Sequence, residues 1–110
     1  MGVARFEVFI GVNNQYQFKL IGPDESPVLV SRGFANKSDC MALIRDIKEN
    51  ATAPERYERM ADNGKLSFRL KAANHKILGV GGPYEKEDER DAAIAVVRKS
   101  VEAAVMDKAH

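Results

Sequence analysis

Four basic side chains and one aromatic side chain lie at alternating positions of short segments rich in strand-forming residues. Arg5 and Phe9 belong to RFEVFI, Lys19 to YQFKLI, and Arg69 and Lys71 to KLSFRLK. Successive side chains of a strand point to opposite faces, so we expect these five residues to share one face of a sheet. Basic side chains contact phosphates and aromatic rings stack on bases, as in sheets that bind single-stranded nucleic acid. They are the candidate binding residues.

The same alternation places polar side chains beside these candidates, which supports a second interpretation. Glu7, Gln15, Gln17 and Ser67 fall on the predicted face as well. An open antiparallel sheet presents a polar face to water without any ligand, and long basic side chains are ordinary there. Phe9 is moreover the one aromatic residue on this face, whereas sheets that stack bases use two or three. The solvated face is therefore the simpler interpretation.

A glycine-rich segment, GVGGPY at residues 79–84, lies between a predicted strand and a predicted helix. A loop in that position can cradle a phosphate at the start of the helix. Tyr84 stands where a dinucleotide-binding motif has its third glycine, and no second strand-helix unit follows to supply an acidic ligand for a ribose. We interpret the segment as a connection that needs backbone freedom.

Residues for catalysis or metal binding are not assembled in any known spacing. Cys40 begins an apolar helical stripe and is predicted to be a small core residue. Neither histidine, His75 or His110, has a neighbouring ligand at the spacing of a metal site. The acidic run at residues 85–89 is typical of a solvated helix start. We therefore predict no catalytic residue, no metal and no cofactor, and favour a binding module over an enzyme.

Composition excludes several classes of protein. The chain has 110 residues and a net charge of +1, with 17 basic and 16 acidic residues, so no strong field attracts nucleic acid or an anionic membrane. No apolar run approaches the roughly 18 residues of a membrane-spanning helix. A single cysteine and the absence of an apolar leader fit a reducing compartment. We expect a cytoplasmic protein without membrane contact.

Hydrophobic periodicity predicts the elements that must position these residues. Alternation predicts strands at about residues 5–10, 15–20 and 28–30, and a period of three to four predicts a helix that ends near Asn50, before Pro54. The second half predicts a hairpin around DNGK at 62–65, a strand around 77–80, and a final helix. Ile94, Val97, Val101 and Val105 are placed on one face of that helix.

The two halves repeat each other at an offset of 50 residues. Apolar or aromatic residues match in five pairs: Phe18 and Phe68, Leu20 and Leu70, Phe34 and Tyr84, Ile44 and Ile94, and Ile47 and Val97. One three-stranded unit with one helix leaves much of its apolar surface uncovered, whereas two units bury a shared core. We predict one domain over residues 1–110, made of repeats at about 5–51 and 56–105.

SFRLKAANH at 67–75, RGF at 32–34 and GPY at 82–84 together carry a resemblance to a known family. The chain resembles the YegP-like proteins, small bacterial proteins classed as a domain of unknown function. The resemblance covers about residues 5–103 and implies a tandem β-β-β-α fold. Because the family has no established activity, the resemblance implies no catalytic or binding residue.

These observations predict an α+β fold of six mostly antiparallel strands, with two helices packed on one face. The predicted function is protein interaction, through the polar sheet face or an exposed strand edge. The alternative is weak binding of single-stranded nucleic acid through Arg5, Lys19, Arg69 and Lys71, beside Phe9. Since the chain carries both repeats, we expect a monomer.

Overall fold

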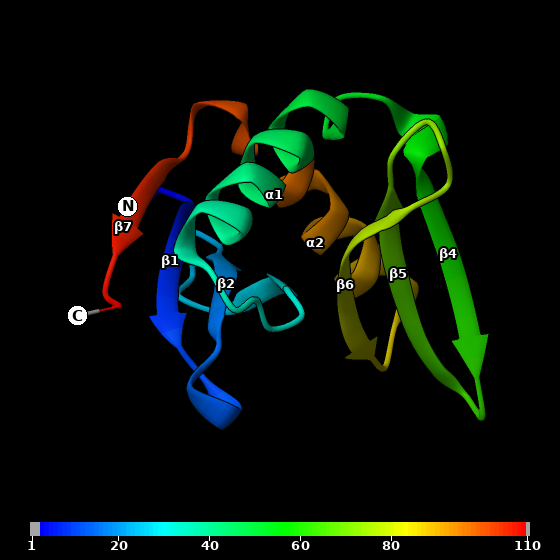
Figure 1. Ribbon diagram of the computed structural model, residues 1–110. Coiled ribbons are helices and arrows are strands. Elements are labelled where there is room, and N and C mark those ends of the chain that lie inside the picture. The colour runs from blue at the N-terminus through cyan, green and yellow to red at the C-terminus, as the bar shows by residue number, and fades with distance from the viewer. Residues whose placement is uncertain (1–2, 110) are drawn as a thin grey trace.

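A computed structural model of the protein describes residues 3–109 and contains one sheet and two α-helices (Figure 1). The strands are β1 (Arg5–Ile10), β2 (Tyr16–Ile21), β3 (Pro27–Val30), β4 (Tyr57–Asp62), β5 (Lys65–Lys71), β6 (Ile77–Tyr84) and β7 (Ala104–Asp107). The helices are α1 (Lys37–Asn50) and α2 (Glu87–Arg98). The strand order is β4-β5-β6-β3-β2-β1-β7, and every pair is antiparallel except β1 with β7. The α+β class is as predicted.

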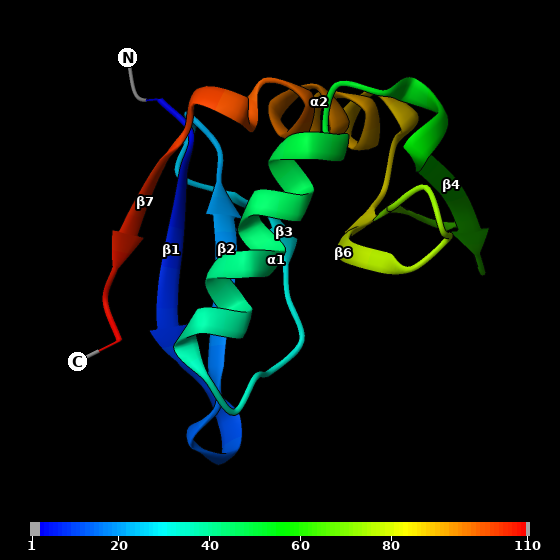
Figure 2. The same ribbon diagram turned by 45° about the horizontal axis from the view of Figure 1, so that its top comes forward.

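Both helices pack on the same face of the sheet and bury the repeated apolar residues (Figure 2). The strands supply Phe18 and Phe68, which have no exposed surface, and α1 and α2 supply Ile47 and Val97, which are equally buried. Each pair is separated by 50 residues. Alternating strand residues and one stripe of each helix are buried in the same core, which explains why the repeat is strongest there.

The two repeats meet at β3 and β6 in the middle of the sheet. Val30 on β3 pairs with Val80 on β6, and these two residues occupy the same position in their repeats. An antiparallel pair of equivalent residues is what a two-fold axis between two identical units would produce. The chain therefore has the architecture of a symmetric dimer joined in one polypeptide, and we refer to this relation as the pseudo-two-fold.

The end of the chain differs from the prediction. The final helix was expected to carry Val101 and Val105 on its apolar stripe, but α2 ends at Arg98. Val101 lies in a 3-10 turn (Ser100–Glu102), and Val105 lies in β7, a seventh strand that pairs with β1 in parallel. Val105 packs against the core from β7, so burial beside β1 outweighs the helical spacing of the valines.

The segment GVGGPY also differs from the prediction, because it belongs to β6 rather than to a connection. Close packing explains why position 81 of this segment is a glycine. A Cβ atom at this position would lie 2.4 Å from the backbone oxygen of Val28 and 2.4 Å from the ring of Phe68. The glycine thus allows β3 and an aromatic core residue to approach β6 closely, and it holds no phosphate loop.

Candidate interaction surfaces

The register of the sheet aligns a row of side chains on the face opposite the helices, which we call the open face. From β4 to β1 the row reads Glu58, Arg69, Val80, Val30, Lys19 and Glu7. It is ordered symmetrically about the pseudo-two-fold: an acid, a base and a valine, then a valine, a base and an acid. Neighbours along the strands, such as Phe68 and Phe18, point to the helices and are buried.

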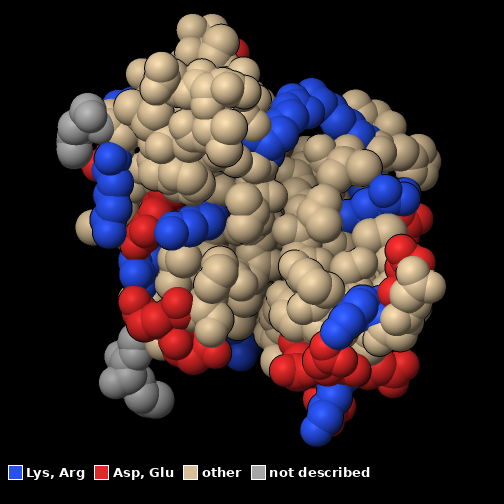
Figure 3. Space-filling model, turned by 90° about the horizontal axis from the view of Figure 1, so that it is seen from below, with Lys and Arg blue, Asp and Glu red and all other residues tan. Residues whose placement is uncertain are grey.

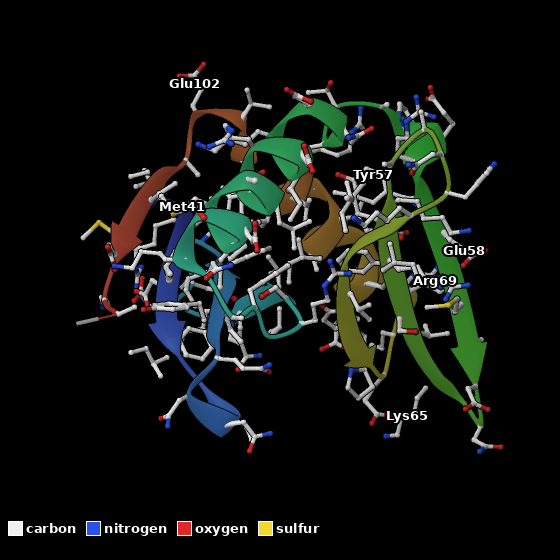
Figure 4. All side chains as sticks on the ribbon, in the orientation of Figure 1. Met41, Tyr57, Glu58, Lys65, Arg69 and Glu102 are labelled. Atoms are coloured by element: carbon white, nitrogen blue, oxygen red, sulfur yellow. The ribbon has the colours of Figure 1, made fainter. Side chains whose placement is uncertain are left out.

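At one end of the row, Glu58 holds two of the predicted basic residues (Figure 4). One carboxylate oxygen accepts a hydrogen bond from Arg69, and the other lies 3.2 Å from the Lys71 ammonium. The Arg69 guanidinium, followed by the Lys71 ammonium, lowers the pKa of the Glu58 carboxyl. Two positive charges are thus shared with one carboxylate, which leaves this group of three residues with one net positive charge.

At the other end of the row, Glu7 and Glu25 hold Arg5. The Arg5 guanidinium donates to Glu7 at 2.7 Å and to both carboxylate oxygens of Glu25, at 2.8 and 2.9 Å. Lys108, just beyond β7, reaches Glu7 at 3.2 Å. Glu7 has only 8% of its side chain exposed, and the hydrogen bond from Arg5 lowers the pKa of its carboxyl. This end is an ion-pair network around one buried carboxylate, whose partners Arg5 and Lys108 are partly exposed.

Lys19 is the predicted basic residue whose contact is with an aromatic ring. Its ammonium lies 5.5 Å from the centre of the Phe9 ring. Among residues 3–109 it forms no ion pair with a carboxylate. The structure therefore separates the five candidates into three arrangements: Arg5 with acids near β1, Lys19 with Phe9, and Arg69 with Lys71 around Glu58.

The centre of the row is apolar and exposed. Val30 has 45% of its surface exposed and Val80 has 46%, although both belong to the two innermost strands. Charged side chains lie mainly towards the margins of the molecule when it is viewed from below, and uncharged residues fill the middle of that view (Figure 3). An apolar centre with a polar rim is the usual anatomy of a protein interface.

The edges of the sheet provide a second kind of surface. Within the described chain the two edge strands are β4 and the short strand β7, which lies outside β1, and neither has a strand on its outer side. The turn at Asn63 and Gly64, with φ of 51° and 79°, is a two-residue hairpin turn that closes on a hydrogen-bonded Asp62–Lys65 pair. By the alternation of an antiparallel ladder, the N–H and C=O of Arg59 then point outward.

The remaining candidates for chemistry are buried or isolated. Cys40 has no exposed surface, and burial raises the pKa of its thiol to about 11, so the reactive thiolate is disfavoured. Within residues 3–109, no three His, Cys, Asp or Glu side chains gather as metal ligands do. No helix of that part of the chain is long and apolar enough to cross a membrane.

A model of one family matches the chain twice in tandem, at residues 12–58 and 61–107, and its description is "Domain of unknown function (DUF1508)". The chain belongs to the DUF1508 family. The first match starts after β1 and ends in β4, and the second starts within β4 and ends with β7. The family unit thus extends past each helix into the strand that follows it.

Relatives and solved structures of this family agree with the fold. The chain is 35% identical to the UPF0339 protein YegP of Escherichia coli over 94 residues, which are 84% of this chain and 86% of YegP. It is 34% identical to a UPF0339 protein of the ptx operon 5′ region in Stutzerimonas stutzeri, with 84% and 85% covered.

Two solution NMR structures are similar along nearly the whole chain. YegP of E. coli superposes with a TM-score of 0.88 at 32% identity, covering 99% of this chain and 96% of that one. A UPF0339 protein of Shewanella oneidensis gives 0.89 at 30% identity, covering 96% and 92%. The resemblance found from the motifs is confirmed, and these family names state no activity.

Sequence reasoning missed the residues that complete the open face. Glu58 pairs with Arg69 and Lys71. It comes to lie beside them only through the register of β4 with β5, which the sequence does not show. Val30 and Val80 have the same offset of 50 as the core pairs, and that offset was the available signal. It does not show that the two valines face water, because a short apolar run is equally typical of a buried strand.

Proposed function

We propose that this DUF1508 protein is an interaction module that binds another protein through the open face of its sheet. The observation that carries the proposal is the exposed pair Val30 and Val80 at the centre of the row, flanked by Arg69, which is ion-paired with Glu58, and by Lys19, which lies over the Phe9 ring. The apolar centre gains free energy when water leaves it, and the fixed charges at its rim select a partner of matching pattern.

A charge at the centre of the open face tests this proposal. Val30→Lys combined with Val80→Lys should abolish recovery of a crosslinked partner from native lysate, because a partner would have to desolvate two ammonium groups. Val12→Lys is the matched control, since Val12 is 76% exposed in the β1–β2 connection and lies outside the row. Recovery of the same partner by the double variant, or of none by the parent protein, would contradict the proposal.

The β4 edge is the other route to a protein partner, and a proline separates the two routes. Arg59→Pro removes an N–H that points away from the sheet, so the fold should tolerate it, but an added strand would lose a hydrogen bond. We expect Arg59→Pro to retain the partner that the valine variant loses. The reverse result would place the interface on the edge.

Weak binding of single-stranded nucleic acid is the second candidate function. The observation in its favour is Lys19 stacked over Phe9 without a carboxylate partner. Arg5, Arg69 and Lys71 share their charge with carboxylates, which weakens attraction to phosphates. Amide shifts in β1 and β2 on adding short single-stranded DNA at low salt, reversed by salt and lost in Lys19→Gln, would favour this function over the first.

We further propose a monomer in the cytoplasm. Both halves of the core are present in one chain, so a second copy is not needed to complete it. Sedimentation velocity at micromolar concentration should give the mass of one chain. A dimer under these conditions would disprove the monomer.

A further inference from the structure

The outer flank of α2 borders a pocket of about 660 Å³ that no part of the open face contributes to. Three walls meet there: α2 itself, the chain before β1 at Ala4, and the segment between α2 and β7 at Ala103. Pro23, from the β2–β3 turn, closes the fourth side. The volume falls within the roughly 300–1,000 Å³ of pockets that hold small molecules.

Small apolar side chains line the α2 wall. Ala92, Ala95 and Val96 face the pocket, and a second hollow of about 420 Å³ adjoins it along Ala92 and Val96. Ala92 and Ala95 are exposed to solvent. The exposed side of an ordinary surface helix is charged or polar, so this composition is unusual for the position.

The pseudo-two-fold supplies an internal reference for that flank. At an offset of 50 residues, Ala95, Val96 and Lys99 of α2 correspond to Arg45, Asp46 and Glu49 of α1. The hollow of about 270 Å³ beside α1, which Asp39, Ala42 and Asp46 line, matches at this offset the second hollow of about 420 Å³ at Glu89, Ala92 and Val96, and not the 660 Å³ pocket. Equivalent helix positions are thus charged at Arg45 and Asp46 on α1 and apolar at Ala95 and Val96 on α2, so the fold alone does not require an apolar wall.

Chain connectivity explains why the pocket has room. Beside α1, a single segment at residues 51–56 runs directly from the helix into β4. Beside α2, the equivalent place is divided between the chain entering β1 and the chain leaving for β7, which lie side by side as parallel strands. The pocket opens where these two segments meet α2.

Charge at the rim indicates the chemistry of an occupant. Lys99 and Glu102 are the charged residues that line the pocket, and neither forms an ion pair or side-chain hydrogen bond with another residue of the described chain. Glu102 lies on the segment between α2 and β7 (Figure 4). One positive and one negative charge leave the rim without net charge, so a charged ligand gains no advantage there.

We propose that this pocket binds a small, uncharged and predominantly apolar molecule. The apolar walls give the affinity, and the two opposite charges at the rim limit binding of ions. The site is separate from the open face, so its test does not depend on the interaction proposed above.

Two related dyes test both the site and its preference for a neutral ligand. N-phenyl-1-naphthylamine is uncharged and fluoresces more strongly in apolar surroundings, and its 8-sulfonate derivative has the same rings with one negative charge. We expect saturable binding of the neutral dye and at least fivefold weaker binding of the sulfonate. Amide shifts should centre on residues 92–104. The proposal would be overturned if the neutral dye did not saturate, if the sulfonate bound equally or more tightly, or if the amide shifts were confined to residues outside the pocket.

Ala95→Arg introduces the residue that α1 carries at the corresponding position. Because Ala95 is exposed, the variant should fold, and its long side chain should fill the pocket and weaken binding of the neutral dye at least tenfold. Ala73→Arg is the matched control, since Ala73 is exposed in the β5–β6 turn, outside the pocket. We expect unchanged affinity for this control. Parental affinity in Ala95→Arg would disprove the site.

Discussion

The two edges of the sheet end differently although the halves that form them repeat. A strand follows each helix: β4 follows α1, and β7 follows α2. β4 continues into the hairpin with β5, whereas β7 pairs with β1 in parallel. The connection after α1 thus leads into β4, the outermost strand of the second half. The connection after α2 leads into β7, which lies outside β1 of the first half.

The helix flanks differ in the same asymmetric way. Core positions such as Ile44 and Ile94 are matched because both halves bury the same layer. Exposed positions of the helices diverge, from Arg45 and Asp46 on α1 to Ala95 and Val96 on α2. Repeated residues therefore identify what the fold needs, and departures from the repeat identify surfaces where the halves serve different purposes.

The largest expected effect tests the equivalence of the halves in the core. Phe18→Ala and Phe68→Ala should each lower the free energy of unfolding by about 3–5 kcal/mol, because both rings are fully buried at corresponding positions. Urea denaturation followed by circular dichroism should show one transition in each variant. Two separate transitions, or a loss confined to one variant, would show that the halves are not one cooperative core.

Removing β7 should make the two edges alike. A chain that stops at Ala103 loses the ladder with β1, the packing of Val105 and the contact of Lys108 with Glu7, and we expect about 2 kcal/mol lower stability. Hydrogen exchange should accelerate in β1 and stay unchanged in β5. Full protection of β1 in the shortened chain would mean that β7 contributes nothing to this edge.

The smallest expected effect compares the two acids of the row. Glu7→Gln should cost about 1–2 kcal/mol at pH 7, because Glu7 is buried between Arg5 and Lys108. Glu58→Gln should cost less, since Glu58 and its partners are partly exposed and solvent screens them. Chemical denaturation at pH 7 measures both, and equal losses would contradict the difference in burial.

Acidification provides a further check on these acids. Ion pairing lowers the pKa of both carboxyls below the ordinary value near 4.5, so the folded state binds protons less readily than the unfolded state. Their stabilisation is present above that value and is lost as the pH falls through the lowered folded pKa. The parental protein should therefore lose more stability than Glu7→Gln on acidification from pH 6 to pH 3. A parallel decline would contradict the linkage.

Much of the fold could be predicted because its signals are local. Alternation located β1 and β2, the DNGK turn located the β4–β5 hairpin, helical spacing located α1, and the offset of 50 predicted a shared core. The error at α2 arose where two interpretations coincide: Val97, Val101 and Val105 suit a helix by spacing, while AVMD also suits a strand. A partner strand that lies far away in the sequence decided between them.

The candidate site was less predictable, for a physical reason. Sequence placed Arg5, Lys19, Arg69 and Lys71 on one face but did not show their partners Glu25 and Glu58, because these ion pairs join different segments of the chain. Glu58 and Arg69 are 11 residues apart, and Lys108 is 101 residues from Glu7. A face that looks cationic in sequence is largely neutralised once the strands are paired.

By itself the sequence determined the class of fold, the repeat and the residues of the core, since these depend on periodicity and burial. Only the tertiary structure decided the seventh strand, the ion-paired rim around Val30 and Val80, and the pocket beside α2. Each of these depends on which strands and segments become neighbours. Long-range pairing sets that arrangement, and a single segment carries no record of it.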